Sequence, residues 1–203
     1  MAATPDPTAP PPFAFRPAPA ELALETERLL LRPIEETDLD EMVQYRGDPE
    51  VCRYLPFEPQ TAVGIRARSG HLFGSVSLEG ERGGISLGVV RRADDALIGD
   101  VLLFHPDPTH GTVEIGWVMH PDAAGQGYAT EACRAVLDAA FRVYGVRRVV
   151  ARIAAKNTSS ARLAERLGMR LEARLVENEW FKGVWGDELD YAILAREWRP
   201  SGE

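Results

Sequence analysis

The chain has 203 residues, of which 45% are apolar, and this is enough for one well-packed domain. No apolar run could span a bilayer and no basic-then-hydrophobic leader opens the chain, so we expect a cytoplasmic protein without membrane contact. The net charge of −8 argues against non-specific nucleic-acid binding and weakly favours an amine-bearing partner. Cys52 and Cys133 lack metal-ligand spacing, so we expect buried reduced thiols and no metal site.

The first part of the chain changes from a proline-rich segment to short capped helices. Residues 1–20 hold seven prolines and little apolar periodicity, so we expect a disordered tail followed by a single domain over residues 21–203. Residues 28–33 predict a strand that stops at a proline. Capping residues predict helices that begin within residues 37–40 and at Asp48, and a less regular helix within residues 60–78.

From residue 85 the apolar pattern takes the period of a strand. Residues 85–91 and 97–104 predict an antiparallel pair around the turn at residues 92–95. Residues 112–119 alternate and predict a further strand.

The glycine loop that follows, Gly125-Gln126-Gly127, leads directly into an apolar stripe over residues 129–144. The stripe recurs in steps of three and four, which predicts a helix buried on one face. Unpaired amides and the helix dipole make such a helix start favourable for phosphate oxygens. A dinucleotide fingerprint is disfavoured by Thr130 and by the basic residues 147–148, and the lysine of a nucleoside-triphosphate loop is missing. A plain strand-to-helix turn remains an alternative.

After this helix the pattern alternates again. Residues 148–154 predict a strand parallel to residues 112–119, because a helical crossover joins the two. Asn157 is a capping residue for a helix that runs to Leu167. Residues 169–176 and 188–198 predict two last strands joined by an aromatic loop at residues 179–185. The predicted fold class is α+β, with a mixed, mostly antiparallel sheet flanked by helices and one parallel junction beside the glycine loop.

Several stretches together resemble one known family. Residues 114–117 with the glycine loop resemble the acetyl-CoA motif of the GNAT superfamily of N-acetyltransferases, and Asn157, Ser160 and residues 167–169 resemble its second motif. Residues 182–188 with Tyr191 and Leu194 resemble the closing segment of its RimJ/RimL-type branch, the ribosomal-protein-alanine acetyltransferases. The likeness covers roughly residues 25–199. It implies a GNAT-like fold with a splayed parallel strand pair, and transfer of an acetyl group from acetyl-CoA, or of another short acyl group, to a primary amine.

The resemblance also implies roles for individual residues. Glu114 is the candidate general base and Ser160 the candidate acid for the thiolate. The candidate cofactor-binding residues are Trp117, Val118, Met119, Ala124, Gly125, Gln126, Gly127, Tyr128, Ala129, Thr130 and Asn157. Two positions depart from the family pattern. Ala124 stands where Gln or Arg is common, and Ala164 stands where many members carry a tyrosine that acts as the general acid.

Each of these assignments has a simpler alternative. Glu114 also fits a solvated strand carboxylate, Asn157 a plain helix cap, and Ser160 a first-turn serine that bonds the local backbone. Aromatic side chains at residues 54, 180, 181 and 185 fit either packing or the wall of an amine pocket. The four histidines show no triad or ligand spacing and receive no role.

The resemblance leaves several classes of acceptor open. A protein N-terminal α-amine is our first expectation, and a small amine such as a polyamine or an aminoglycoside is the second. A third hypothesis is that the chain is a non-catalytic module that binds acyl-CoA. The chain is expected to act as a monomer or homodimer.

Overall fold

The computed structural model describes residues 13–79, 83–107 and 110–200. The helices are α1 (Leu39–Arg46), α2 (Pro49–Cys52), α3 (Ala62–Ser69), α4 (Tyr128–Arg142) and α5 (Thr158–Arg166), with short 3-10 turns between some of them. The strands are β1 (Leu24–Glu25), β2 (Leu29–Pro33), β3 (Gly84–Arg91), β4 (Ala96–Asp107), β5 (Thr112–Met119), β6 (Arg148–Ala154), β7 (Arg170–Phe181) and β8 (Val184–Leu194). None of the helices in these ranges is long and apolar enough to cross a membrane.

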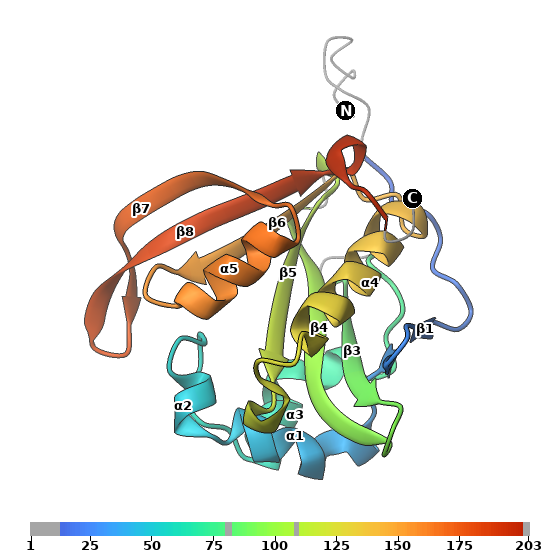
Figure 1. The fold of residues 1–203 in the computed structure, drawn as a ribbon, viewed down its shortest axis with the longest axis horizontal. Coiled ribbons are helices and arrows are strands. Elements are labelled where there is room, and N and C mark those ends of the chain that lie inside the picture. Colours follow the sequence, from blue (N-terminus) through green and yellow to red (C-terminus); the bar gives the residue numbers. More distant parts are fainter. Residues whose placement is uncertain (1–12, 80–82, 108–109, 201–203) are drawn as a thin grey trace, which may run out of the picture.

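The strands form one sheet in the order β1-β2-β3-β4-β5-β6-β8-β7 (Figure 1). Among the described strands β5 and β6 pair in parallel, and every other neighbouring pair is antiparallel. The parallel pair follows from the α4 crossover, because a strand reached through a helix on one face runs in the same direction as the strand before it. The predicted mixed, mostly antiparallel α+β fold is confirmed.

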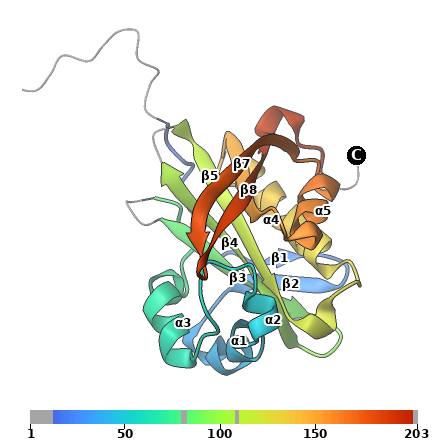
Figure 2. The same cartoon turned by 90° about the vertical axis from the view of Figure 1, so that its left-hand side faces the viewer.

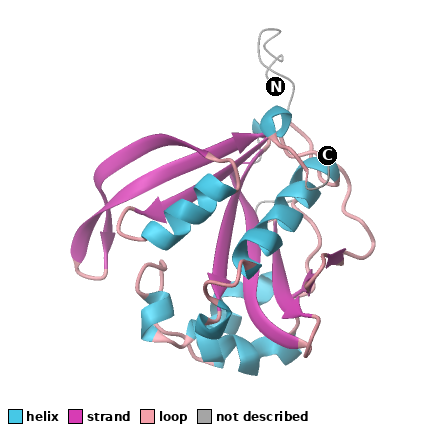
Figure 3. Cartoon of the chain, viewed as in Figure 1, coloured by secondary structure: helices cyan, strands magenta, loops and turns pink. Residues whose placement is uncertain are grey.

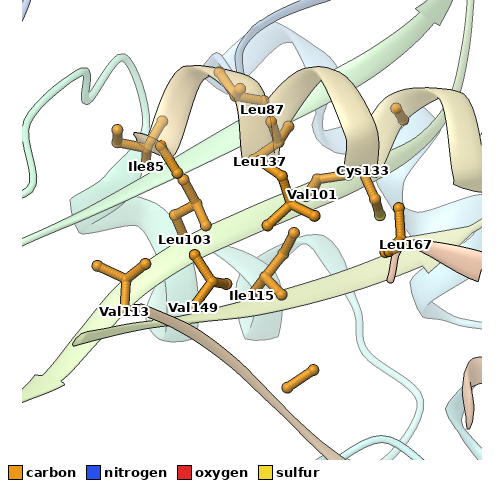
Figure 4. Packing of buried hydrophobic residues seen from close by; sticks show 14 of the residues in the cluster. Ile85, Leu87, Val101, Leu103, Val113, Ile115, Cys133, Leu137, Val149 and Leu167 are labelled. Atoms are coloured by element: carbon orange, nitrogen blue, oxygen red, sulfur yellow. The ribbon is translucent and has the colours of Figure 1, made fainter. Parts of the chain in front are cut away.

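Helices cover both faces of this sheet (Figure 2). The larger apolar cluster lies between the sheet and α4 with α5, and includes Val101, Ile115 and Leu137 (Figure 4). A smaller cluster on the opposite face joins α1 and α3 to the sheet, and includes Ile65 and Val118. Each central strand therefore buries side chains on both faces, which fixes its register.

The central elements match the sequence pattern closely. The strand predicted at residues 112–119 is β5, and the strand predicted at residues 148–154 is β6. Helix α4 begins one residue after Gly127, and Asn157 caps α5 by accepting a hydrogen bond from the Ser160 amide at 3.1 Å. Both cysteines are buried and free, as expected.

The predicted aromatic loop at residues 179–185 is wrong. Strands β7 and β8 continue through it and are joined by a two-residue turn, Lys182-Gly183, and their hairpin extends beyond the rest of the sheet (Figure 3). Both turn residues have positive φ, 48° and 82°, which is the pattern of a tight hairpin turn. The predicted helix within residues 60–78 is also shorter than its limits, because α3 ends at Ser69.

The N-terminal segment contacts the domain before the predicted boundary at residue 21. Residues 1–12 of the predicted tail lie outside the described residues. Phe15 is buried in the larger cluster, and the Arg16 amide donates a hydrogen bond to the Tyr144 carbonyl at 2.9 Å. The boundary remains a prediction, and these contacts argue for placing it nearer to residue 13.

Candidate active site

Strands β5 and β6 diverge along their length. They pair only through residues 112–114 opposite residues 148–150, whereas β5 stays paired with β4 as far as Met119 (Figure 1). The His120 amide donates to the Ile98 carbonyl on the β4 side at 2.8 Å. Because successive amides of a strand point to alternate sides, the amides of Trp117 and Met119 face the gap that β6 leaves.

A cavity of about 630 Å³ lies at this gap. Side chains from both faces of the sheet line it, so it passes between the two strands. From the face of α1 and α3 come Arg46, residues 54–57 and Arg68, and from the face of α5 come Asn157 and Ser160. The predicted catalytic residues Glu114 and Ser160 therefore line one cavity, together with Trp117 and Val118.

Glu114 lies on the last part of β5 that still pairs with β6, and its side chain is 14% exposed. Its Oε2 accepts a hydrogen bond from Arg152 at 3.0 Å. Burial raises the pKa of Glu114 to about 7, because the lowering by Arg152 is smaller and the carboxylates of Glu188 and Asp190 add to the rise. A carboxylate of this pKa changes its protonation state near neutral pH, which suits a proton acceptor.

Ser160 and Trp117 contact each other across the gap. The indole Nε1 of Trp117 donates to the Ser160 hydroxyl oxygen at 3.2 Å, so the hydroxyl proton of Ser160 can point elsewhere. Asn157 uses its Oδ1 to accept from the Ser160 amide at 3.1 Å and from the Ser159 hydroxyl at 2.8 Å. Its predicted alternative as a helix cap is thus confirmed, and its Nδ2 makes no hydrogen bond within the described part of the chain.

The glycine loop forms the start of α4. Gly125 and Gly127 have φ of 73° and 83°, in the left-handed region that favours glycine. No side chain of the described residues caps the first turn of α4, and a Cβ placed on Gly125 would meet no atom within 4 Å. The loop thus leaves the start of α4, a helix of 15 residues, exposed to solvent. Such a helix start is a favourable position for a diphosphate.

The remaining predicted loop residues make structural contacts. Gln126 donates from Nε2 to the Asp122 carbonyl at 2.7 Å, and the Thr130 hydroxyl accepts from Arg166 at 3.3 Å. The Tyr128 ring lies 4.4 Å from the Arg28 guanidinium carbon. Ala124 ends the 3-10 turn before the loop, and Ala129 packs at the edge of the larger cluster. These residues lie beside the helix start and, like Met119, do not line the cavity.

Two arginines of the site were not predicted from the sequence. Arg28, on the approach to β2, donates to the Gln126 carbonyl at 3.0 Å and bridges to Glu131, which brings a cation to the glycine loop. Arg152 is the partner of Glu114. Neither has a local motif, although Arg152 lies on the parallel strand two residues beyond the position opposite Glu114.

A buried ion pair also lines the cavity. Asp100 accepts hydrogen bonds from Arg46 at 3.0 and 2.5 Å and from the Tyr45 hydroxyl at 2.8 Å. The Asp100 carboxylate holds the pKa of Arg46 above its usual value, although burial opposes this. The pair joins α1 to β4, since Arg46 lies on α1 and Asp100 on β4. It lies at the edge of the cavity, because Asp100 is opposite Val118 of β5.

The aromatic residues divide between the two predicted alternatives. Tyr54 lines the cavity, whereas Trp180 and Trp185 pack edge to face at 5.4 Å on the β7–β8 hairpin and are more than half exposed. Lys182 at the hairpin turn donates to the Cys52 carbonyl at 2.6 Å, which ties the hairpin to α2. Residues 54–57, which follow α2, therefore lie in a segment that is anchored at its start.

A family model, sequence relatives and solved structures all indicate the same family for this chain. Residues 28–170 match the model of the acetyltransferase (GNAT) domain. The chain is 31% identical to the uncharacterized N-acetyltransferase YnaD of Bacillus subtilis (strain 168), over 86% of this chain and 98% of that one. It is 33% identical to the uncharacterized N-acetyltransferase p20 of Bacillus licheniformis, over 86% and 97%.

Solved structures agree with these sequence relatives. A GNAT-family acetyltransferase from Bacillus anthracis superposes with a TM-score of 0.77 at 30% identity, covering 87% of this chain and 100% of that one. The uncapped start of α4 and the gap beside β5 fit the diphosphate and the thioester arm of acetyl-CoA. The chain belongs to the GNAT acetyltransferase family and is an acetyl-CoA-dependent N-acetyltransferase that acts on an amine.

Proposed function

We propose that the acceptor is the N-terminal α-amine of a protein or peptide and that the chain is of the RimJ/RimL type. The observation that carries this is the cavity, which residues on the face of α1 and α3 line together with Glu114, so that a terminal amine bound there would lie beside the thioester arm. A relative supports the choice of acceptor. YdaF of Bacillus subtilis (strain 168), whose name proposes a ribosomal N-acetyltransferase, is 30% identical over 52% of this chain and 57% of that one.

In this proposal Glu114 accepts the proton of the attacking amine, directly or through a water molecule. Acetyl-CoA supplies the activated acyl group, and the protein supplies the proton acceptor and the orientation of the amine. Oε1 of Glu114 makes no hydrogen bond within the described residues, so it is available to the amine, while Arg152 holds Oε2. The amides of Trp117 and Met119, which face the gap, orient the acyl carbonyl and the pantetheine arm.

Ser160 is proposed to donate a hydrogen bond to the departing thiolate, since Trp117 already occupies one of its acceptor positions, and the thiolate takes up the proton that the amine has given to Glu114. Asn157 holds the pantetheine arm through Nδ2. The amides over residues 125–130 hold the diphosphate, and side-chain contacts at Gln126, Tyr128 and Thr130 stabilise that loop. Val118 lines the cavity on the face of the sheet that α1 and α3 cover.

Substituting Gly125 with Ala should weaken CoA binding about tenfold, because the new methyl group lies where the diphosphate approaches the backbone. The left-handed φ of 73° also costs stability, about 1–2 kcal/mol. Gly183→Ala is the matched control, since its φ is 82° and its added Cβ also meets nothing within 4 Å. Calorimetric titration with CoA checks the prediction, and an equal Kd in the two variants would contradict it.

Substituting Ser160 with Ala should lower kcat about tenfold, the size of one lost hydrogen bond to a developing charge. Ser159→Ala is the control, because Ser159 is exposed and, among the described residues, its hydroxyl bonds only Asn157. Steady-state thiol release measures both. Equal kcat in Ser160→Ala and the unmodified enzyme would remove Ser160 from the reaction.

The acceptor itself is tested by thiol release with an amine panel. We expect peptides with a free N-terminus to be acetylated and their N-blocked forms to be inert. A small amine is the second candidate, because a spermidine N(1)-acetyltransferase of Vibrio cholerae is 28% identical over 52% of this chain and 61% of that one. Faster turnover of spermidine than of every peptide would replace the first proposal by the second.

A further inference from the structure

The charges that line the cavity do not balance. Among the described residues, the charged side chains of the lining are Arg46, Arg68, Asp100, Glu114 and Arg152. Arg46 pairs with Asp100, and Arg152 pairs with Glu114 and, at 4.0 Å, with Asp190, which lies outside the lining. Within the described ranges Arg68 has no carboxylate within ion-pair distance, so among the described lining residues it is the guanidinium without a carboxylate partner.

The surroundings of Arg68 hold its guanidinium in place without neutralising it. Its carbon lies 4.9 Å from the centre of the Phe57 ring, and the Arg46 guanidinium lies 5.4 Å from the same ring. Burial and the positive charge of Arg46 both lower the pKa of Arg68, although an arginine remains charged at neutral pH. Arg68 is exposed to solvent, and its guanidinium, stacked on an aromatic ring at the cavity wall, can bind a planar anion through two hydrogen bonds.

The position of Arg68 separates it from the cofactor. Arg68 lies on α3, which packs through Ile65 on the face of the sheet opposite α4 (Figure 2). The glycine loop and the start of α4 belong to the other face. An anion bound at Arg68 would therefore lie on the opposite face of the sheet from the diphosphate of CoA.

We propose that Arg68 is a specificity-determining residue that binds a carboxylate carried by the acceptor amine. The inference rests on the proposed function, whose cavity it uses, and it narrows the acceptor to amines that also bear an acid group. An acidic side chain near the N-terminus of a peptide and the main-chain carboxylate of a free amino acid both supply this chemistry. A polyamine does not, since it brings only positive charge toward Arg68.

The experiment compares matched acceptors in the presence of acetyl-CoA. The peptide arm uses alanyl-aspartyl-alaninamide against alanyl-asparaginyl-alaninamide, and the amino-acid arm uses alanine against alaninamide. Each acceptor is measured with the unmodified enzyme, with Arg68→Gln and with Arg66→Gln. Arg66 is the matched control, because it lies on the same helix, pairs with Glu36 and does not line the cavity.

Arg68→Gln should lower kcat/KM roughly 10- to 100-fold for the carboxylate-bearing member of the preferred arm, and less than threefold for its amide partner. Comparing the two enzymes on each acceptor cancels the intrinsic reactivity of the amine. Arg66→Gln should change neither value. The arm that shows the selective loss identifies the source of the carboxylate.

An equal loss for both members of a pair would show that Arg68 acts on the fold alone, and no loss would show that it binds no acceptor; either result overturns the inference. If none of the four acceptors leads to release of the CoA thiol, the proposal that the enzyme acetylates such α-amines fails. The inference is then decided by calorimetric titration of the CoA-loaded enzyme. It stands if Arg68→Gln weakens binding of the carboxylate member by the same factor, and it falls if carboxylate and amide bind alike or not at all.

Discussion

We expect Glu114→Gln to lower kcat about 100-fold or more while leaving the Kd for CoA unchanged, because the amide keeps the shape of the side chain but cannot accept a proton. The pKa of Glu114 is raised to about 7 by burial, so the base is protonated and inactive well below that pH. The kcat/KM of the unmodified enzyme should therefore rise with pH through a limb centred near 7, and the variant should lose this limb. A terminal amine, whose pKa is near 8, should give a second limb that both enzymes keep.

The control for this prediction is Glu188→Gln. Glu188 lies outside the cavity lining, but its charge contributes to the raised pKa of Glu114. Its removal should move the first limb to lower pH and leave the plateau of kcat/KM nearly unchanged. Activity of Glu114→Gln within threefold of the unmodified enzyme would exclude Glu114 as the base.

The largest loss of stability should follow from Asp100→Asn. The carboxylate is 1% exposed and compensates the buried guanidinium of Arg46, which would be left without a counter-ion. Removing one partner of such a pair costs about 3–5 kcal/mol of unfolding free energy. Urea denaturation followed by circular dichroism measures the difference.

Two further variants separate the buried charge from other causes. Asp94→Asn removes the carboxylate from the partly exposed pair with Arg91 and should lower the free energy of unfolding much less than Asp100→Asn, because water screens the exposed pair. Combining Arg46→Met with Asp100→Leu removes both buried charges and should be more stable than Asp100→Asn alone. A loss below 1 kcal/mol for Asp100→Asn, or a double variant less stable than the single one, would contradict the argument.

The sequence by itself determined the elements whose signals are local. Alternation predicted β5 and β6 to the residue, and the glycine loop with its apolar stripe predicted the start of α4. The cap at Asn157 predicted the start of α5. Local signals failed in the hairpin, because aromatic residues and a Lys-Gly turn fit a loop as well as two long strands when the pairing partner is unknown.

Only the tertiary structure decided which side chains meet and which charges remain uncompensated. Glu114 and Arg152 are 38 residues apart in sequence, and Arg46 and Asp100 are 54 apart, so no periodic pattern relates them. Arg68 stands out only once the other charges of the cavity are paired. The raised pKa of Glu114 depends on burial by strands far away in the chain, and burial and Coulomb interactions depend on distances in space, which the sequence sets only through the completed fold.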